Sequence, residues 1–257
     1  MRTILTFVLF ISLAYSSKSQ TIDLSAWKQD SLPTGERLYS ANQSSNNWTF
    51  VKKGNKILIE ENDFKPEKGD NLPFTQEFIE KHLEEIKGNR FVKSVEGGYL
   101  VGLNRGEFGG GLLFVSDDGL TTYIIGRFLR IKEIFELDSK VYAIEGLAHL
   151  GSQTGQIIEI FKGDGIWKYK TLSKLSETPA LIAKKDNQPI IITSQYILRL
   201  NSNLEIEEIL KSPFYWGMLY PSSIHFENKD IYLAMRKGIL KIEDFETAPK
   251  YRWFVKK

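Results

Sequence analysis

From residue 91 onward, short apolar runs alternate with turn-forming residues, a pattern that predicts antiparallel strands joined by hairpins. The first group of predicted strands covers residues 91–95, 99–103, 112–115 and 122–125. Three more groups of four follow. The second covers residues 131–137, 141–145, 156–161 and 167–172, and the third covers residues 180–183, 190–193, 197–200 and 205–210. The fourth covers residues 223–226, 231–235, 239–242 and 251–255. Equivalent second-strand positions recur about every forty residues, at Tyr99, Tyr142, Ile191 and Tyr232.

Four strands in each group and a spacing in the forties are typical of the blades of a β-propeller. The sequence therefore predicts an all-β protein, a propeller of about four to five blades with one N-terminal helix. An antiparallel β-sandwich is the alternative, because sandwiches also bury alternating apolar residues and use similar turns.

The N-terminal third is less regular. Residues 48–51 and 56–60 predict a hairpin, a candidate fifth blade in a ring that strands from both termini could close. A helix is predicted over residues 75–87, with Thr75 as its N-cap and an apolar stripe that includes Ile79 and Leu83. His82 lies on that stripe and is interpreted as a packed residue.

A turn between the third and fourth predicted strands carries a motif. Residues 116–123 read Ser-Asp-Asp-Gly-Leu-Thr-Thr-Tyr. This segment resembles the Asp box of sialidase-type and related β-propellers, Ser-x-Asp-Gly-Gly-x-Thr-Trp, with Leu120 in place of the second Gly and Tyr123 in place of the Trp. The resemblance implies a structural hairpin turn, away from the catalytic face of those families, and it implies no chemistry.

The first nineteen residues have the features of a secretory signal peptide. Arg2 precedes an apolar run, and small residues follow it at the spacing of a cleavage site, before Ser17 or Gln20. We expect residues 20–257 to form a single propeller-like domain in the exported, secreted or periplasmic protein. The mature chain would contain as many Lys and Arg as Asp and Glu, and it has no cysteine. This balance predicts no nucleic-acid partner, and no second apolar run predicts insertion into a membrane.

The loops that join second to third strands, and those that join successive blades, should gather on one face of a propeller. These loops supply the candidate ligand-binding residues, which are Arg105, Glu107, Glu145, His149, Tyr215, Trp216 and Arg236. Aromatic rings beside arginines and carboxylates are typical of sites for sugars or organic acids. The alternative interpretation assigns these residues no ligand: the charged residues belong to ordinary surface loops, and the aromatic residues pack between blades.

No specific catalytic, cofactor or metal motif is recognisable. The sequence has no nucleophile elbow, no P-loop and no His-Glu-x-x-His, and its three histidines lack ligand spacing. The glycine-rich segment 106–111 lies between two predicted strands, so it is interpreted as a flexible loop and not as a phosphate-binding loop. Two functions remain open. The first is a binding protein that recognises a glycan, peptide or partner protein through the loop face. The second is a small exported hydrolase or lyase that acts on a carbohydrate-like or acidic substrate through acidic and arginine residues of the same face, with Glu107 and Glu145 as an acid–base pair if the fold brings them together.

Overall fold

The computed structural model describes residues 21–54, 56–62, 72–83, 86 and 90–257. The predicted signal peptide lies outside these residues. The described chain is dominated by short antiparallel strands that separate into five sheets.

Four of the sheets are meanders, in which strands pair in their order along the sequence. The first contains β4 (Arg90–Val95), β5 (Gly98–Asn104), β6 (Gly110–Ser116) and β7 (Thr122–Arg127). The second contains β8 (Ile131–Leu137), β9 (Lys140–His149), β10 (Ser152–Gly163) and β11 (Ile166–Leu175). The third contains β12 (Pro179–Lys185), β13 (Gln188–Thr193), β14 (Tyr196–Leu200) and β15 (Ile206–Lys211). The fourth contains β16 (Ser223–Glu227), β17 (Asp230–Met235), β18 (Gly238–Glu243) and β19 (Lys250–Lys256).

These sheets coincide with the four predicted groups of strands, and the prediction of an all-β, propeller-like fold is confirmed. The sandwich alternative is wrong, because the strands form five small sheets and not two large ones. A fifth strand, β1 (Trp27–Asp30), pairs antiparallel with β19, so segments near both ends of the chain meet in the fourth sheet.

The N-terminal third supplies the predicted hairpin and two short helices. The hairpin consists of β2 (Trp48–Lys53) and β3 (Lys56–Glu61), and the hydroxyl of Ser223 accepts a hydrogen bond from the Phe50 backbone N–H at 2.7 Å. Helix α2 (Gln76–His82) is capped as predicted, since the Thr75 hydroxyl accepts from the Phe78 N–H at 3.2 Å, but it ends at His82. Helix α1 (Glu36–Asn42) was not predicted.

The second strand of each meander is buried on both faces, which accounts for its unbroken apolar sequence. In β13, Ile190 and Ile192 join the cluster shared with the fourth sheet, whereas Ile191 joins the cluster shared with the second sheet. All three side chains are almost completely buried. Successive residues of one strand therefore belong to the cores on opposite sides of their sheet.

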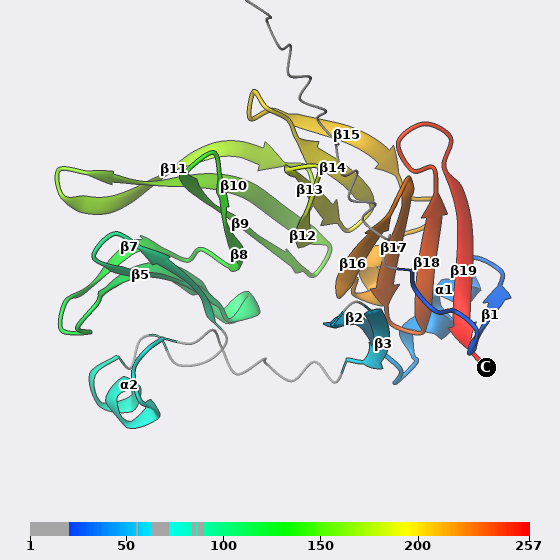
Figure 1. Cartoon of the computed structure of the whole chain (residues 1–257), viewed down its shortest axis with the longest axis horizontal. Coiled ribbons are helices and arrows are strands. Elements are labelled where there is room, and N and C mark those ends of the chain that lie inside the picture. Colours follow the sequence, from blue (N-terminus) through cyan, green and yellow to red (C-terminus); the bar gives the residue numbers. More distant parts are fainter. Residues whose placement is uncertain (1–20, 55, 63–71, 84–85, 87–89) are drawn as a thin grey trace, which may run out of the picture.

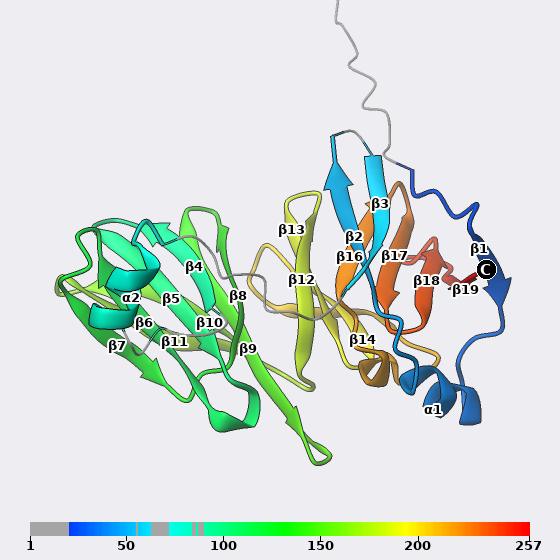
Figure 2. The same cartoon turned by 90° about the horizontal axis from the view of Figure 1, so that it is seen from below.

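The hydrophobic clusters join the sheets in series. They connect the first sheet to the second, the second to the third, the third to the fourth, and the fourth to the β2–β3 hairpin. The far face of the first sheet packs against α2. None of these clusters, as far as the described residues go, joins the hairpin to the first sheet. Figures 1 and 2 show the sheets following one another along an arc from β4–β7 to β16–β19.

The Asp-box-like turn has the hydrogen bonds of a structural hairpin. The Ser116 hydroxyl donates to the Asp118 carboxylate at 2.5 Å and accepts from the Thr121 N–H at 2.9 Å. Asp118 also accepts from the Leu120 N–H at 2.9 Å. Gly119 takes a φ of 73°, in the left-handed region that glycine favours. These bonds connect β6 to β7 and leave the turn no evident chemical role.

The bond from Ser116, together with that from the Leu120 N–H, lowers the pKa of Asp118 below its usual value of 3.8. Because the folded-state pKa is depressed, the contribution of this carboxylate to stability is present above pH 3.8 and is lost as the pH falls through the folded-state value. We therefore expect Asp118→Ala to unfold more readily than the wild type at pH 6, and the difference to shrink as the pH falls below 3.8. Urea unfolding at a series of pH values measures this; a difference independent of pH would contradict it.

Candidate functional site

Loops from successive sheets lie on one side of the arc. The β5–β6 and β9–β10 connections belong to the first and second sheets, and the chain between β15 and β16 leads from the third sheet to the fourth. We call this side the loop face. In Figure 2 the β9–β10 hairpin and α1 extend toward the same side.

Glu107 and His149 come together on the loop face. Glu107 lies in a short 3₁₀ turn, Gly106–Phe108, and His149 is the last residue of β9. The His149 Nδ1 atom lies 2.8 Å from the Glu107 Oε2 atom, and both side chains are about half exposed. Two residues that the sequence placed on separate blades are therefore a polar pair between the first and second sheets, within reach of solvent.

Glu145 has a more structural environment. Its side chain is buried, and its Oε2 atom accepts a hydrogen bond from the Arg130 backbone N–H at 3.2 Å. The Arg130 side chain in turn donates to the carbonyls of Gly106, at 3.3 Å, and Phe128, at 2.9 Å. Glu145 thus holds the β7–β8 connection against the 3₁₀ turn that carries Glu107.

Tyr215 belongs to a polar network that the sequence did not reveal. Its hydroxyl accepts from the Gln153 side-chain amide at 2.8 Å. The Gln153 carbonyl oxygen accepts from the Ser194 hydroxyl at 2.9 Å and from the Thr178 N–H at 3.2 Å. Gln153 lies on β10, so this network joins the second sheet to the third and fixes Tyr215 beside it.

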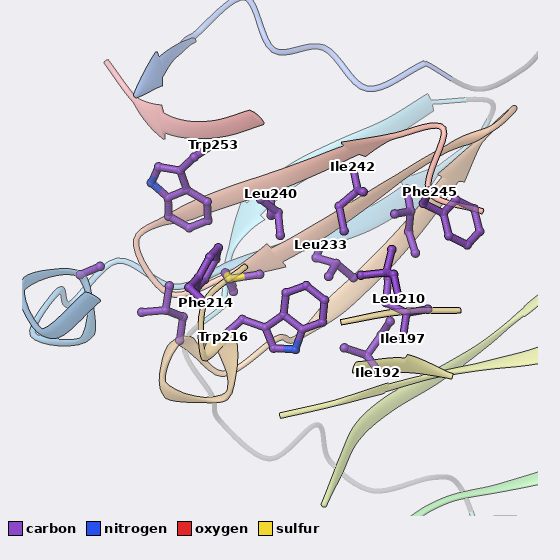
Figure 3. Close-up of a cluster of buried hydrophobic side chains, with 14 of the residues drawn as sticks. Ile192, Ile197, Leu210, Phe214, Trp216, Leu233, Leu240, Ile242, Phe245 and Trp253 are labelled. Atoms are coloured by element: carbon purple, nitrogen blue, oxygen red, sulfur yellow. The ribbon is translucent and has the colours of Figure 1, made fainter. Parts of the chain in front are cut away.

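Trp216 lies in the core and not on an open surface. Its side chain is wholly buried, and its indole N–H donates to the Thr193 carbonyl at 2.8 Å. Figure 3 shows it among the apolar side chains of the third and fourth sheets, near Ile192 and Leu233. Trp216 is therefore a packing residue and not an exposed ring on which a ligand could stack. This agrees with the interpretation that the aromatic residues pack between blades.

Arg236 bridges the fourth sheet and the end of α1. Its guanidinium donates to the Asn47 side chain at 3.1 Å, and to the Asn42 carbonyl and side chain at 2.8 and 3.0 Å. The guanidinium carbon lies 4.5 Å from the centre of the Tyr220 ring. These contacts occupy Arg236 in positioning the N-terminal segment, so it is a tether between chain segments.

Arg105 lines a hollow of about 280 Å³ at the edge of the loop face. Its lining also includes Phe108, Arg127 and Phe128, none of which the sequence singled out. Phe108 is 86% exposed and Phe128 is 71% exposed, and Leu150, at the tip of the β9–β10 hairpin, is 91% exposed. A signal for Phe108 was available, because an aromatic residue among glycines has few neighbours in sequence with which to pack.

The glycine-rich segment is more ordered than predicted. Gly106 begins the 3₁₀ turn, and Gly110 begins β6. A Cβ atom on Gly110 would lie 2.2 Å from the Leu129 carbonyl oxygen, so the close approach of β6 to the next connection requires glycine.

The described part of the chain contains no group of three or more His, Cys, Asp or Glu residues that could hold a metal ion. In the same residues, no helix is long and apolar enough to cross a bilayer.

Comparisons with known proteins assign no family. No protein-family model matches the chain, and no curated protein matches it. Among solved structures, it is similar to a structural-genomics protein of unknown function from Bacteroides thetaiotaomicron VPI-5482, with 14% identity, a TM-score of 0.43, and coverage of 63% of this chain and 42% of that one. It is also similar to virginiamycin B lyase from Staphylococcus aureus, with 15% identity, a TM-score of 0.40, and coverage of 63% and 54%.

A third similar structure is a thermostable family-43 glycoside hydrolase, with 12% identity, a TM-score of 0.33, and coverage of 66% of this chain and 71% of that one. The chain spans about half the length of the first two structures. Similarity at this level assigns neither an activity nor a ligand.

The contacts of Arg236 predict a loss of stability when it is replaced. We expect Arg236→Ala to lower the free energy of unfolding by about 2 kcal/mol, because charge-assisted hydrogen bonds to Asn42 and Asn47 are lost. Lys237→Gln is the matched control, since Lys237 is the exposed neighbour in the same turn. Denaturant unfolding measures both; equal stability of Arg236→Ala and the wild type would show that the tether is energetically unimportant.

Proposed function

We propose that this protein is an exported binding protein that recognises a peptide, a glycan or a partner protein through its loop face. The observation that carries the proposal is the exposure of Phe108, Phe128 and Leu150 around the Glu107–His149 pair. Large apolar side chains gathered on a surface are typical of interaction sites, because they lose unfavourable contact with water when a partner covers them.

The contacts of the other candidate residues favour binding over catalysis. Glu145, Trp216 and Arg236 are engaged in holding the loops together, and Tyr215 is fixed by Gln153. Their contacts make the loop face a preorganised surface, which lowers the entropic cost of binding a partner. The apolar residues supply contact area, and Glu107 and His149 supply polar groups that orient the ligand.

The alternative is a small exported hydrolase or lyase, and one observation favours it. A carboxylate oxygen 2.8 Å from a nitrogen of a half-exposed imidazole is an arrangement that general acid–base catalysis uses. Under this alternative His149 would transfer the proton and Glu107 would orient the imidazole.

A thermal-shift panel of simple sugars, acidic sugars, glycan fragments and short peptides tests the binding proposal. A ligand at about one hundred times its Kd should raise the Tm by several degrees. We expect the double variant Phe108→Ser/Phe128→Asn to lose this shift, because both exposed rings are removed; asparagine suits the positive φ of Phe128. Leu120→Ser, equally exposed on the Asp-box-like turn, is the control that should keep it.

Two outcomes would contradict the proposal. A shift that survives the double variant would place the ligand elsewhere on the molecule. Conversion of a panel compound to product, abolished by His149→Ala, would replace the binding function with the enzymatic alternative.

Export rests on the N-terminal residue pattern. We expect the full-length chain, expressed in a bacterial host, to reach the periplasm or medium with its N-terminus at Ser17 or Gln20. Intact-mass spectrometry of the exported fraction measures the cleavage site. Replacing Leu9 by Arg within the apolar run should keep the protein uncleaved inside the cell, whereas Leu9→Ile should not; retention of the wild type at full mass would refute export.

A further inference from the structure

Strand β7 forms an outer edge of the first sheet. The sheet order is β4-β5-β6-β7, and within the described chain β7 pairs with β6 alone. No described strand pairs with the other side of β7, and such an edge is one that a further strand can extend.

A groove of about 740 Å³ runs beside this edge. Every residue of β7, from Thr122 to Arg127, lines it, together with His82 and Leu83 at the end of α2. Successive side chains of a strand point to opposite faces of its sheet, so a groove that touches all of them follows the edge itself and not one face. The edge of β7 and the end of α2 thus line the same groove.

The register of the sheet indicates which main-chain groups point into the groove. The Ser116 N–H donates to the carbonyl of Thr121, the residue before β7, at 2.9 Å, so these residues form a hydrogen-bonded pair that the ladder continues with Val115 opposite Thr122. In an antiparallel ladder the next pair directs its N–H and C=O groups outward, and the pattern alternates. Thr122 and Ile124 therefore direct their main-chain groups toward the groove.

The groove continues toward the loop face, where it meets the hollow lined by Arg105 and Phe108. The two cavities share Leu113, Ile124 and Arg127 among their lining residues. No described residue that lines either cavity is acidic, whereas Arg105 and Arg127 are cationic. A segment lying along β7 would thus meet positive charge and two exposed aromatic rings at one end.

We propose that β7 binds an extended, acidic peptide segment of a partner protein as a fifth strand of the first sheet. This inference rests on the proposed function and specifies its partner. Main-chain hydrogen bonds to Thr122 and Ile124 provide affinity, apolar peptide residues pack on Leu113 and the phenylalanines, and a peptide carboxylate pairs with Arg127. The fourth sheet already holds such a fifth strand, since β1 pairs with the outer edge of β19.

The probe is a fluorescein-labelled peptide of alternating valine and glutamate, as long as β7, titrated against residues 20–257 by fluorescence anisotropy. We expect it to bind, and a valine–lysine peptide of the same length to bind much more weakly. Thr122→Pro removes the outward N–H at the first position of the strand, where proline is tolerated, and should raise the Kd about fivefold or more. Thr122→Ala keeps the N–H and should bind like the wild type.

Two further readouts do not depend on the folding of the proline variant. Hydrogen exchange of the wild type should show the amides of Thr122 and Ile124 protected when the peptide is bound. Arg127→Glu should weaken binding about fivefold or more, and Arg127→Lys should retain most of it. Unprotected amides together with equal affinity of Thr122→Pro and Thr122→Ala would overturn strand addition.

The outcomes separate this inference from the proposed function. If the acidic peptide fails to bind while a ligand of the thermal-shift panel still acts through Phe108 and Phe128, strand addition is refuted and the binding function stands. If neither the peptide nor any compound of the panel binds, both proposals are refuted. Self-association measured by light scattering, and abolished by Thr122→Pro, would show that the edge serves a second copy of this chain and would overturn the peptide partner.

Discussion

The burial of both faces of each sheet is the constraint on which the rest of this structure depends. A strand such as β13, in which Ile190, Ile191 and Ile192 alternate between two cores, is stable only if another layer covers each side of its sheet. Within the series, each sheet serves as the cover of the next. At the two ends a different element must take that role, and the structure uses α2 at one end and the β2–β3 hairpin at the other.

Polar residues of the loop face complement this apolar stacking. Gln153 joins the second sheet to the third, Glu145 fixes the connection from the first to the second, and Arg236 attaches α1 to the fourth. With no disulfide available in a chain that lacks cysteine, the relative positions of the sheets depend on cores and on such hydrogen bonds. These hydrogen bonds thereby fix the loop face, which is the preorganisation that the proposed binding of a partner requires.

The sequence was sufficient to predict the strands of the four meanders, because apolar runs and turn residues report on burial and chain reversal over a few residues. It was insufficient for β1 and α1. Trp27–Asp30 has one buried residue followed by three exposed ones, and its pairing with β19 is decided by the fold. Helix α1 follows Gly35, which provides no side-chain cap, so no local signal marks its start.

The environments of the candidate site residues could not be predicted from the sequence for a related reason. Residue type indicates that Trp216, Glu145 and Arg236 can bind something, but only the fold decides that their partners are Thr193, Arg130 and Asn42.

The surface available to an external partner depends on which strand edges the fold leaves unpaired. β1 occupies the outer edge of β19, whereas β7 has an open groove beside its outer edge. Main-chain groups at an edge offer the same hydrogen bonds to any extended segment, so selectivity must come from neighbouring side chains. Here those neighbours are two arginines and two exposed phenylalanines at the loop face, which in the proposed complex would select for an acidic and partly apolar segment. The edge would thus determine how the partner binds, and the loops would determine which partner binds.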